Sequence, residues 1–500
     1  MTNERRAPGQ RGAIDGGGFR FDTRYTRLPP VFYSFGEPRG APQPQVVLVN
    51  QTLARELGLR LDELTAESQA ALFSGRRLAR GSVPFSQAYA GHQFGGFTML
   101  GDGRAHVLGE HITPDGARVD IQLKGSGHTP YSRGGDGRAT LGPMLREYVI
   151  SEAMAALNVP TARSLAVVST GAAVLRDGPL PGAILTRVAA SHLRIGTFEF
   201  AAALDDPTPL RQLVAYAIDR HDPTLSDEPC PALALWDAVA RRQAKLVASW
   251  MRVGFVHGVM NTDNVTISGE TIDYGPCAFM DRYAGATVFS SIDRNGRYAF
   301  GNQPWITRWN LARFAEALLP LIDPDQSRAV AIAQERLTRF RTWMNDAWTD
   351  MMRAKLGLPG QRPDDLSLAT DLLELMEKAS ADYTDTFRAL SGATAVPAAL
   401  DATPGWDGWR TRWDARCERA RGAAPSAAAR ARMRRVNPAV IPRNHLVQGA
   451  LDAAVKADDP GPLHRLLAAL RSPYDERPAL APFQEPPPAA FCNYRTFCGT

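Results

Sequence analysis

The feature that most constrains the fold is a set of four polar residues that occur in a fixed order along the chain. Lys124 closes an apolar run, VDIQLK, and Glu147 follows within a segment of helical periodicity. Much further along, H-G-x-x-x-x-x-N ends at Asn264, and I-D-Y-G then presents Asp273, which we expect after a short pair of strands. A strand lysine neutralises phosphate charge, a helix glutamate holds that lysine, and Asn and Asp are hard oxygen ligands for Mg²⁺. This order is typical of a kinase-type nucleotide site.

The elements around these residues predict two lobes of different composition. Residues 85–125 are β-rich, and TPDG predicts a hairpin turn before the Lys124 strand. Residues 141–160 predict an amphipathic helix, and two strand-like runs, SLAVVST and GAILTRV, follow it. The chain is mainly helical after about residue 200. We therefore predict an α+β, protein-kinase-like two-lobed fold, with a small β-rich N-lobe containing one key helix and a larger helical C-lobe.

The predicted organisation has four parts, with an extension at each end. They are a flexible N-terminal tail (1–20), a nucleotide-binding N-lobe with its extension (21–195), a helical C-lobe with the catalytic and metal-binding loops (196–480), and a C-terminal tail with a redox cysteine (481–500).

Composition excludes several classes of function. A net charge of +5 on 500 residues does not favour nucleic-acid or membrane binding. The Arg-rich segment 410–435 is better explained as a solvated helical surface. The N-terminus has no apolar signal region, and no apolar run approaches the roughly 20 residues that span a bilayer. We expect a cytoplasmic monomer whose five cysteines, which have no C-x-x-C spacing, are free thiols.

Lysine usage singles out Lys124. Only five of the 57 basic residues are lysines, so a retained lysine can mark a position that requires a compact ammonium instead of a planar guanidinium. Lys124 is the one in a glycine-rich, strand-flanked setting.

The chain departs from the kinase pattern at the catalytic position. Where H-G-D-x-x-x-x-N proteins have an aspartate, this chain has Val259, which cannot accept a proton. Asp263 stands instead directly before Asn264. Either the base has moved or the chemistry is not ordinary γ-phosphoryl transfer; alternatively, Asp263 is a turn or cap residue.

Further candidates are polar loops on either side of the Lys124 strand. The motif GDGRA occurs twice, and it offers backbone N–H groups and arginines to phosphate, although both copies could be simple β-turns. Arg187 and Arg194 fall near the expected junction of the lobes, where taken alone they would form surface salt bridges.

Several longer motifs resemble the selenoprotein O family. They are YAGHQFGGFTMLGDGRAHVLGE, QLKGSGHTPYSRGGDGRA, LREYVISEAM, HGVMNTDN, IDYGPCAFMD, NPAVIPRNH and the terminal YRTFCGT, so the likeness extends from about residue 20 to the end. The resemblance implies a kinase-like enzyme that binds ATP in an inverted orientation. It also implies Mg²⁺ or Mn²⁺ and the transfer of AMP to Ser, Thr or Tyr hydroxyls of target proteins.

The resemblance also implies roles for individual residues. Lys124 and Glu147 would form the ion pair, Asn264 and Asp273 would hold the metal, and Asp263 would be the general base. The nucleotide contacts would be Gly101, Gly103, Arg104, Lys124, Asp136, Gly137, Arg187, Arg194 and Asp273. Cys498, third from the end, would form a regulatory disulfide with Cys277.

Three alternatives stay open. They are a true kinase with a displaced base, a protein uridylyltransferase that uses Mn²⁺ and UTP, and a catalytically silent nucleotide-binding scaffold.

Overall fold

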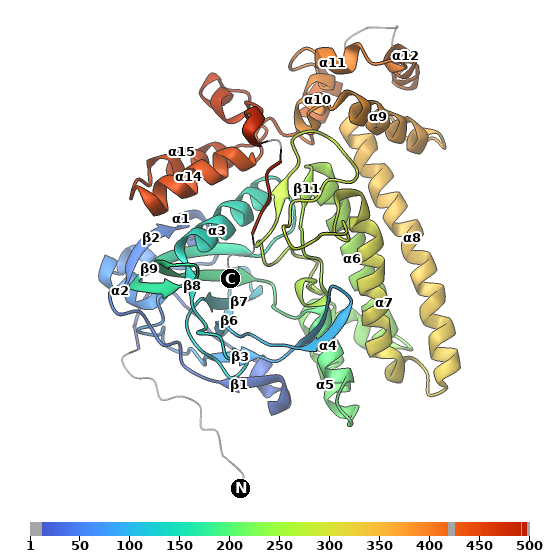
Figure 1. Ribbon diagram of the computed structural model, residues 1–500. Helices are drawn as coiled ribbons and strands as arrows, with labels where there is room; N and C mark the ends of the chain where they lie inside the picture. Colours follow the sequence, from blue (N-terminus) through green and yellow to red (C-terminus); the bar gives the residue numbers. More distant parts are fainter. Residues whose placement is uncertain (1–12, 419–425, 492, 498–500) are drawn as a thin grey trace.

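The N-lobe is built on one antiparallel sheet of eight strands in a computed structural model that describes residues 13–418, 426–491 and 493–497 (Figure 1). The strand order is β1-β3-β6-β7-β10-β9-β2, and β8 pairs with β10. The bounds are β1 Tyr33–Phe35, β2 Gln45–Val49, β3 Phe85–Gln87, β6 Ala105–Ile112, β7 Arg118–Lys124, β8 Ala139–Thr140, β9 Arg163–Leu175 and β10 Pro179–Ala189. The predicted TPDG turn joins β6 to β7.

The register of β7 against β10 sets a row of polar side chains on one face of the sheet. Lys124 lies opposite Leu185, and Gln122 lies opposite Arg187. Alternate residues of a strand point to the same face, and residues directly opposite each other share that face. Asp120, Gln122, Lys124 and Arg187 therefore all project from the same side of the sheet.

Helix α3 (Leu141–Ala156) is covered on two sides, which explains why nearly all of its long side chains are buried. One side contacts β9 and β10. The other contacts α14 (Asn444–Lys456) and α15 (Gly461–Leu470), two C-terminal helices that lie beside α3 in Figure 1. These two helices were predicted within the helical lobe but contact the N-lobe helix instead, because the outer surface of α3 is apolar as well.

The second lobe is helical, as expected. Its helices are α4 Ile195–Ala202, α5 Thr208–His221, α6 Pro231–Arg252, α7 Gln303–Ile322, α8 Gln326–Leu356, α9 Asp365–Ala379, α10 Tyr383–Leu390, α11 Ala398–Asp401, α12 Trp406–Arg416 and α13 Ala427–Arg434. The apolar face of α6 is buried against its neighbours, α7 and α8. The small sheet lobe and the larger helical lobe confirm the predicted α+β, kinase-like two-lobed fold.

Short elements position the loops between the lobes. β11 (Phe255–Val256) pairs with β12 (Ala278–Phe279), and a 3₁₀ turn, η5 (Thr262–Asn264), lies between them in sequence. A separate hairpin, β4 (Ala90–Gln93) and β5 (Gly96–Met99), leaves the N-lobe and reaches α4. Two small helices, α1 (Gln51–Glu56) and α2 (Ala66–Phe73), complete the N-lobe, and the Asn50 side chain caps α1 by accepting the Leu53 N–H.

The prediction of a short strand pair before Asp273 was wrong. Only single bridges form there, Arg194 with Thr266 and Thr161 with Thr271. Thr266 and Thr271 therefore pair with residues that precede α4, and they do not pair with each other.

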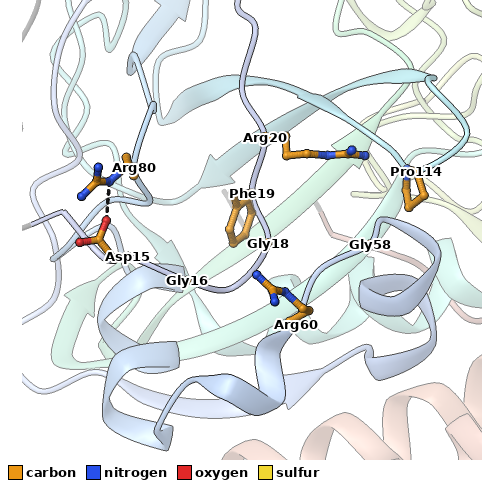
Figure 2. A pocket seen from close by; sticks show the side chains of 9 residues that line it. All are labelled: Asp15, Gly16, Gly18, Phe19, Arg20, Gly58, Arg60, Arg80 and Pro114. Carbon is orange, nitrogen blue, oxygen red and sulfur yellow. Dashed lines mark hydrogen bonds and ion pairs between the residues drawn. The ribbon is translucent and has the colours of Figure 1, made fainter.

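The prediction of a flexible tail over residues 1–20 was wrong for its described part. Ile14 is buried, and its N–H donates to the Leu78 carbonyl. Figure 2 shows Asp15 paired with Arg80 and Phe19 lining the same shallow cavity of about 440 Å³. The apolar side chain of Ile14 anchors this segment to the outer core of the N-lobe.

None of the helices within the described ranges has both the length and the apolar character needed to cross a bilayer.

Candidate active site

A cleft of about 800 Å³ lies where the two lobes meet, and it gathers almost every predicted site residue. Its walls include Gly101, Gly103, Arg104, Lys124, Asp136, Gly137, Glu147, Arg187, Arg194, Asp263, Asn264 and Asp273. Cys277 is not among the lining residues, and Cys498 lies outside the described residues.

Lys124 forms a buried ion pair at the centre of the cleft. Its Nζ lies 2.7 Å from Glu147 Oε2 and 2.7 Å from Asp273 Oδ1. Strand β7 brings the lysine from one side, and α3 brings the glutamate from the other. The Lys124–Glu147 contact is the geometry that the sequence predicted for a kinase-type site.

Arg187 is buried beside this pair, which excludes the alternative of a surface salt bridge. Only 3% of its side chain is exposed. Its Nε donates to Glu147 Oε1 at 3.0 Å, and its Nη2 lies 2.6 Å from Asp273 Oδ1. Its position opposite Gln122 in the sheet directs it to the cleft and not to solvent.

Arg194 is a second buried arginine at the inner end of the cleft, so the surface alternative is excluded for it too. Its Nη2 lies 3.8 Å from Asp273 Oδ2 and 3.9 Å from Asp102 Oδ1, and its guanidinium stacks over the Tyr89 ring at 4.3 Å. Its Nε has no hydrogen-bond partner within the described residues. A buried donor without a partner is costly, so this atom suits an anionic ligand.

The charges at this end of the cleft control the ionisation of Asp273. Burial alone would raise its pKa, but the cations of Arg187, Lys124 and Arg194 hold that pKa well below its ordinary value. The backbone of Asp273 is left-handed, with φ of 62°, a conformation that Asp adopts more readily than most residues. The carboxylate is therefore ionised and faces the cleft.

Asp263 lies in η5, under the backbone of the β4–β5 hairpin. A Cβ placed on Gly91 would lie 2.6 Å from Asp263 Oδ1, so only glycine allows this approach. Oδ1 has no hydrogen-bond partner among the described residues. Burial raises the pKa of Asp263 to about 6, and Arg194 opposes that rise. The carboxylate is thus more basic than an ordinary aspartate but still ionised at neutral pH.

Asn264 is fixed by its own loop. Its Nδ2 donates to the Val259 carbonyl at 3.1 Å, which leaves the amide oxygen as the available group. Asn264 and Asp273 both line the cleft and offer hard oxygens of the kind that Mg²⁺ and Mn²⁺ accept. Within the described residues no group of three or more His, Cys, Asp or Glu could hold an ion, so a metal here would take further ligands from phosphate and water.

The two GDGRA loops are joined through the segment that follows Lys124. The Gly125 N–H donates to the Arg104 carbonyl at 2.7 Å, and the Gly127 N–H donates to the Gly137 carbonyl at 3.0 Å. A Cβ on Gly137 would lie 2.1 Å from the carbonyl oxygen of Gly127, and the φ of Gly137 is 70°. The glycine is therefore required by chain packing, and both loops line the cleft mouth.

Asp136 is bound to protein groups at the cleft edge. Its carboxylate lies 3.0 Å from Arg176 Nη1 and accepts the Arg138 N–H at 2.9 Å.

The sequence did not indicate two groups of lining residues. Tyr89 and Asp102 flank Arg194; Asp102 lies within the first GDGRA motif, so its position could have suggested it. The C-terminal residues 494–497 line the mouth of the cleft, and Thr496 Oγ1 donates to the Pro276 carbonyl at 2.7 Å. No local pattern connects the tail to the Asp273 loop.

A kinase-like fold with a buried Lys–Glu pair and adjacent oxygen ligands defines a class of nucleotide-dependent transferases. Within that class the chain belongs to the SelO family: residues 18–471 match the family model described as "Protein adenylyltransferase SelO". It is 54% identical over 483 residues to "Protein nucleotidyltransferase YdiU" of Geobacillus kaustophilus, covering 97% of this chain and 99% of the relative. The protein of the same description from Alkaliphilus metalliredigens is also 54% identical, with 97% and 98% covered. The chain is therefore a nucleotidyltransferase.

The solved structures that match include "ROP2 from Toxoplasma gondii: A virulence factor with a protein-kinase fold and no enzymatic activity". It is 11% identical, with a TM-score of 0.25, and the match covers 66% of this chain and 86% of that one. The sheet of the N-lobe and the helices of the C-lobe define the two-lobed fold of this chain.

Proposed function

We propose that the protein transfers AMP from ATP to hydroxyl side chains of target proteins. The observation that carries the proposal is Asp263, a largely buried carboxylate that lines the cleft together with Asn264 and Asp273, whereas Val259 stands at the usual position of a kinase base. The family description and the names of the relatives support nucleotidyl transfer to protein.

The chemical step is a displacement at the α-phosphorus. The target hydroxyl oxygen attacks this phosphorus while Asp263 accepts the hydroxyl proton. The bond between the α-phosphorus and the bridging oxygen breaks, and pyrophosphate leaves with that oxygen. The product is a phosphodiester between AMP and the side chain.

The distribution of cations supports an inverted nucleotide. Arg187 and Arg194 are both almost fully buried at the inner end of the cleft, where they suit the β- and γ-phosphates. With the terminal phosphates inside, the α-phosphorus lies nearer the mouth, where a protein hydroxyl can enter. Lys124 holds phosphate charge as a compact ammonium, fixed by Glu147.

Asn264 and Asp273 are the residues that would hold Mg²⁺ or Mn²⁺. The bound ion supplies positive charge that offsets the charge on the phosphates. We expect a chelator to abolish transfer and either ion to restore it.

Labelled nucleotides test the proposal. Wild-type protein with a cell lysate and α-labelled ATP should label target proteins, whereas γ-labelled ATP should not. Asp263→Asn should reduce labelling by at least about 10³-fold, because general-base contributions are of that order. Asp371→Asn, an exposed aspartate on α9 that pairs with Arg412, is the matched control and should retain full activity.

The other outcomes correspond to the alternatives. Transfer of the γ label would identify a kinase with a displaced base, and stronger labelling by UTP with Mn²⁺ would identify uridylyl transfer. Labelling no higher than background with both wild type and Asp263→Asn would leave only the nucleotide-binding scaffold, and equal labelling above background would show that Asp263 is not the base.

A redox switch between Cys277 and Cys498 is part of the proposal. The Cys277 thiol is buried, and burial raises its pKa to about 12, so it is a weak nucleophile in this conformation. The tail contacts the Cys277 loop through Thr496 and Pro276, which supports an approach of the two segments. Mass spectrometry of peroxide-treated protein should find the Cys277–Cys498 linkage; its absence would remove the switch and leave the transfer chemistry unaffected.

A further inference from the structure

The β4–β5 hairpin exposes large apolar side chains beside the cleft. Phe94 is 42% exposed, Phe97 is 47% exposed and Met99 is 49% exposed. In Figure 1 the hairpin is the light-blue arm that leaves the sheet and reaches α4. Exposed apolar residues that occur singly are normal, but a cluster on one hairpin indicates an interaction surface.

The hairpin is attached to the loop that carries the general base. The His92 N–H donates to Thr262 Oγ1 at 2.7 Å, and the Phe94 N–H donates to Asn261 Oδ1 at 3.1 Å. Gly91 lies directly against Asp263. The base loop and the exposed hairpin therefore form one unit. Gly91 covers Asp263 on one face of the hairpin, and Phe97 and Met99, which lie opposite His92 and Ala90, are on the other face.

Aromatic residues of the helical lobe extend this surface. The Phe94 ring lies 5.2 Å from the Tyr298 ring, and Arg297 stacks over Trp309 at 4.8 Å and reaches Trp305 at 5.9 Å. Trp305 is 54% exposed. Rigid aromatic side chains that are half-buried in this way are favoured anchors for a partner, because little conformational entropy is lost when they are covered.

The surface is continuous with the mouth of the cleft. Phe94 lines the cleft together with Ile292 and Phe497, which are 51% and 74% exposed. The only other exposed aliphatic pair on a hairpin of the described N-lobe sheet, Leu175 and Leu180, lies at the far end of β9 and β10.

We propose that the β4–β5 hairpin, with Phe94, Phe97 and Met99, is the docking surface for the target protein. It binds a segment in which the acceptor hydroxyl is flanked by large apolar side chains, which contact the hairpin while the hydroxyl faces Asp263. This inference rests on the proposed transfer to protein, and it adds the part of the molecule that selects the acceptor.

The test uses two peptide mixtures, each with Ser, Thr or Tyr at the centre. One mixture has Leu and Phe as flanking residues, and the other has Gly and Gln. The wild type should label the apolar mixture with a KM about tenfold lower, a typical effect of truncating or omitting an interface anchor. Phe97→Thr with Met99→Thr should remove this preference by raising the KM of the apolar mixture, with kcat unchanged. Leu175→Thr with Leu180→Thr is the matched control and should behave as wild type.

A binding measurement separates failure of the docking surface from failure of the transfer reaction. Fluorescence anisotropy with the labelled apolar peptides measures docking without turnover, and hydrolysis of ATP to AMP measures the cleft without an acceptor. If the Phe97→Thr, Met99→Thr variant binds and labels apolar peptides as the wild type does, the docking surface is wrong even though transfer is retained. If the wild type binds apolar peptides through the hairpin but transfers no nucleotide, the proposed function is wrong instead.

Discussion

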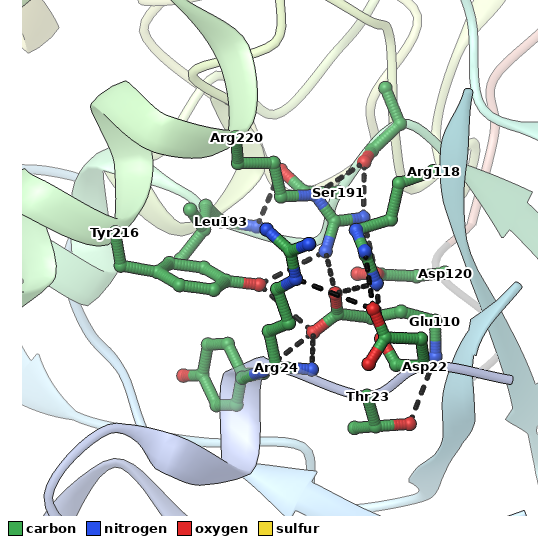
Figure 3. Close-up of polar contacts among 12 residues, drawn as sticks. Asp22, Thr23, Arg24, Glu110, Arg118, Asp120, Ser191, Leu193, Tyr216 and Arg220 are labelled. Atoms are coloured by element: carbon green, nitrogen blue, oxygen red, sulfur yellow. Dashed lines mark hydrogen bonds and ion pairs between the residues drawn. The ribbon is translucent and has the colours of Figure 1, made fainter. Parts of the chain in front are cut away.

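Two clusters of charged residues lie on the same face of the N-lobe sheet, and their contrast separates a binding site from a structural junction. The cleft cluster contains Lys124, Glu147, Arg187, Arg194 and Asp273. The junction cluster, shown in Figure 3, contains Asp22, Glu110, Arg118, Asp120, Tyr216 and Arg220. Strand β7 contributes Lys124 to the cleft cluster and Asp120 to the junction cluster. The pairing of β7 with β10 therefore places both clusters on one face of the sheet.

The centre of the junction cluster, formed by Glu110, Asp120 and Arg220, is closed, whereas Asp22 at its edge is 43% exposed. Glu110 Oε1 accepts the Tyr25 N–H and the Tyr216 hydroxyl at 3.0 Å, and its Oε2 lies 2.9 Å from Arg220 Nη1. Arg220 Nη2 also lies 2.7 Å from Asp120 Oδ1. Because Tyr216 and Arg220 come from α5, these contacts attach the helical lobe to the sheet.

The cleft cluster contains the same residue types but is open. The side chain of Asp273 is 24% exposed and lines the cavity, whereas those of Glu110 and Asp120 are at most 5% exposed. The buried Nε of Arg194 still lacks a partner within the described residues. The cleft cluster can take a ligand because Asp273 is exposed to the cavity and the Arg194 Nε–H has no partner within the described residues.

The largest expected effect is a loss of transfer activity on substitution of Lys124 in the cleft cluster. Lys124→Arg should lower transfer by about 10³-fold, about 4 kcal/mol, because a planar guanidinium cannot replace an ammonium held at 2.7 Å by two carboxylates. The midpoint of thermal unfolding should change little. Steady-state labelling and calorimetry measure the two effects, with Lys378→Arg on the exposed side of α9 as control. Activity at the wild-type level would show that the lysine is not required.

The next largest effect concerns the junction cluster, where a substitution should lower stability and leave the transfer rate unchanged. Arg220→Met removes one partner of a buried charge cluster and should destabilise the fold by about 3 kcal/mol, since Glu110 and Asp120 lose their shared cation. The rate per folded molecule should stay close to wild type. Urea denaturation measures the stability, and the exposed Arg412→Met should change it by less than about 0.5 kcal/mol. If Arg220→Met had normal stability but lost transfer activity, the junction cluster could not be purely structural.

The smallest effect concerns Glu270, which lies near Asp120 and Arg220 of the junction cluster and accepts the Ala190 N–H at 2.9 Å. Burial raises its pKa to about 7, above the value of 4.5 expected in the unfolded chain. A raised carboxyl pKa gives stability that is fully present below pH 4.5 and is lost as the pH rises through about 7. Because the side chain is partly exposed, we expect a loss of about 1 kcal/mol between pH 5 and pH 8. Glu270→Gln should remove that part of the pH dependence in urea titrations, and an unchanged slope would contradict the assignment.

The sequence predicted what local patterns encode. The Lys124 strand, the Glu147 helix and the TPDG turn depend on neighbours close in sequence, and all three are present as predicted. The burial of Arg187 could not be predicted in this way, because it depends on the register between β7 and β10.

Long-range contacts account for the other differences. The placement of α14 and α15 on α3 joins residues 141–156 to residues 444–470, and the contact of Arg146 with the Tyr494 hydroxyl joins residues 348 positions apart. Ile14 anchors the N-terminal segment through a core that its own glycine-rich surroundings do not suggest. Hydrophobic patterns identify such surfaces as buried but do not say which partner covers them.

The β4–β5 hairpin reaches the base loop through backbone atoms, namely the N–H groups of His92 and Phe94 and the uncovered Cα of Gly91. The side chains of Phe97 and Met99 lie on the other face of the hairpin, so they can change while these backbone contacts to the Asp263 loop are kept. Over evolutionary time, related enzymes could acquire new targets by substituting a few tip residues while the chemistry is inherited intact. The same separation gives an engineer a small and well-defined segment in which to redirect the enzyme.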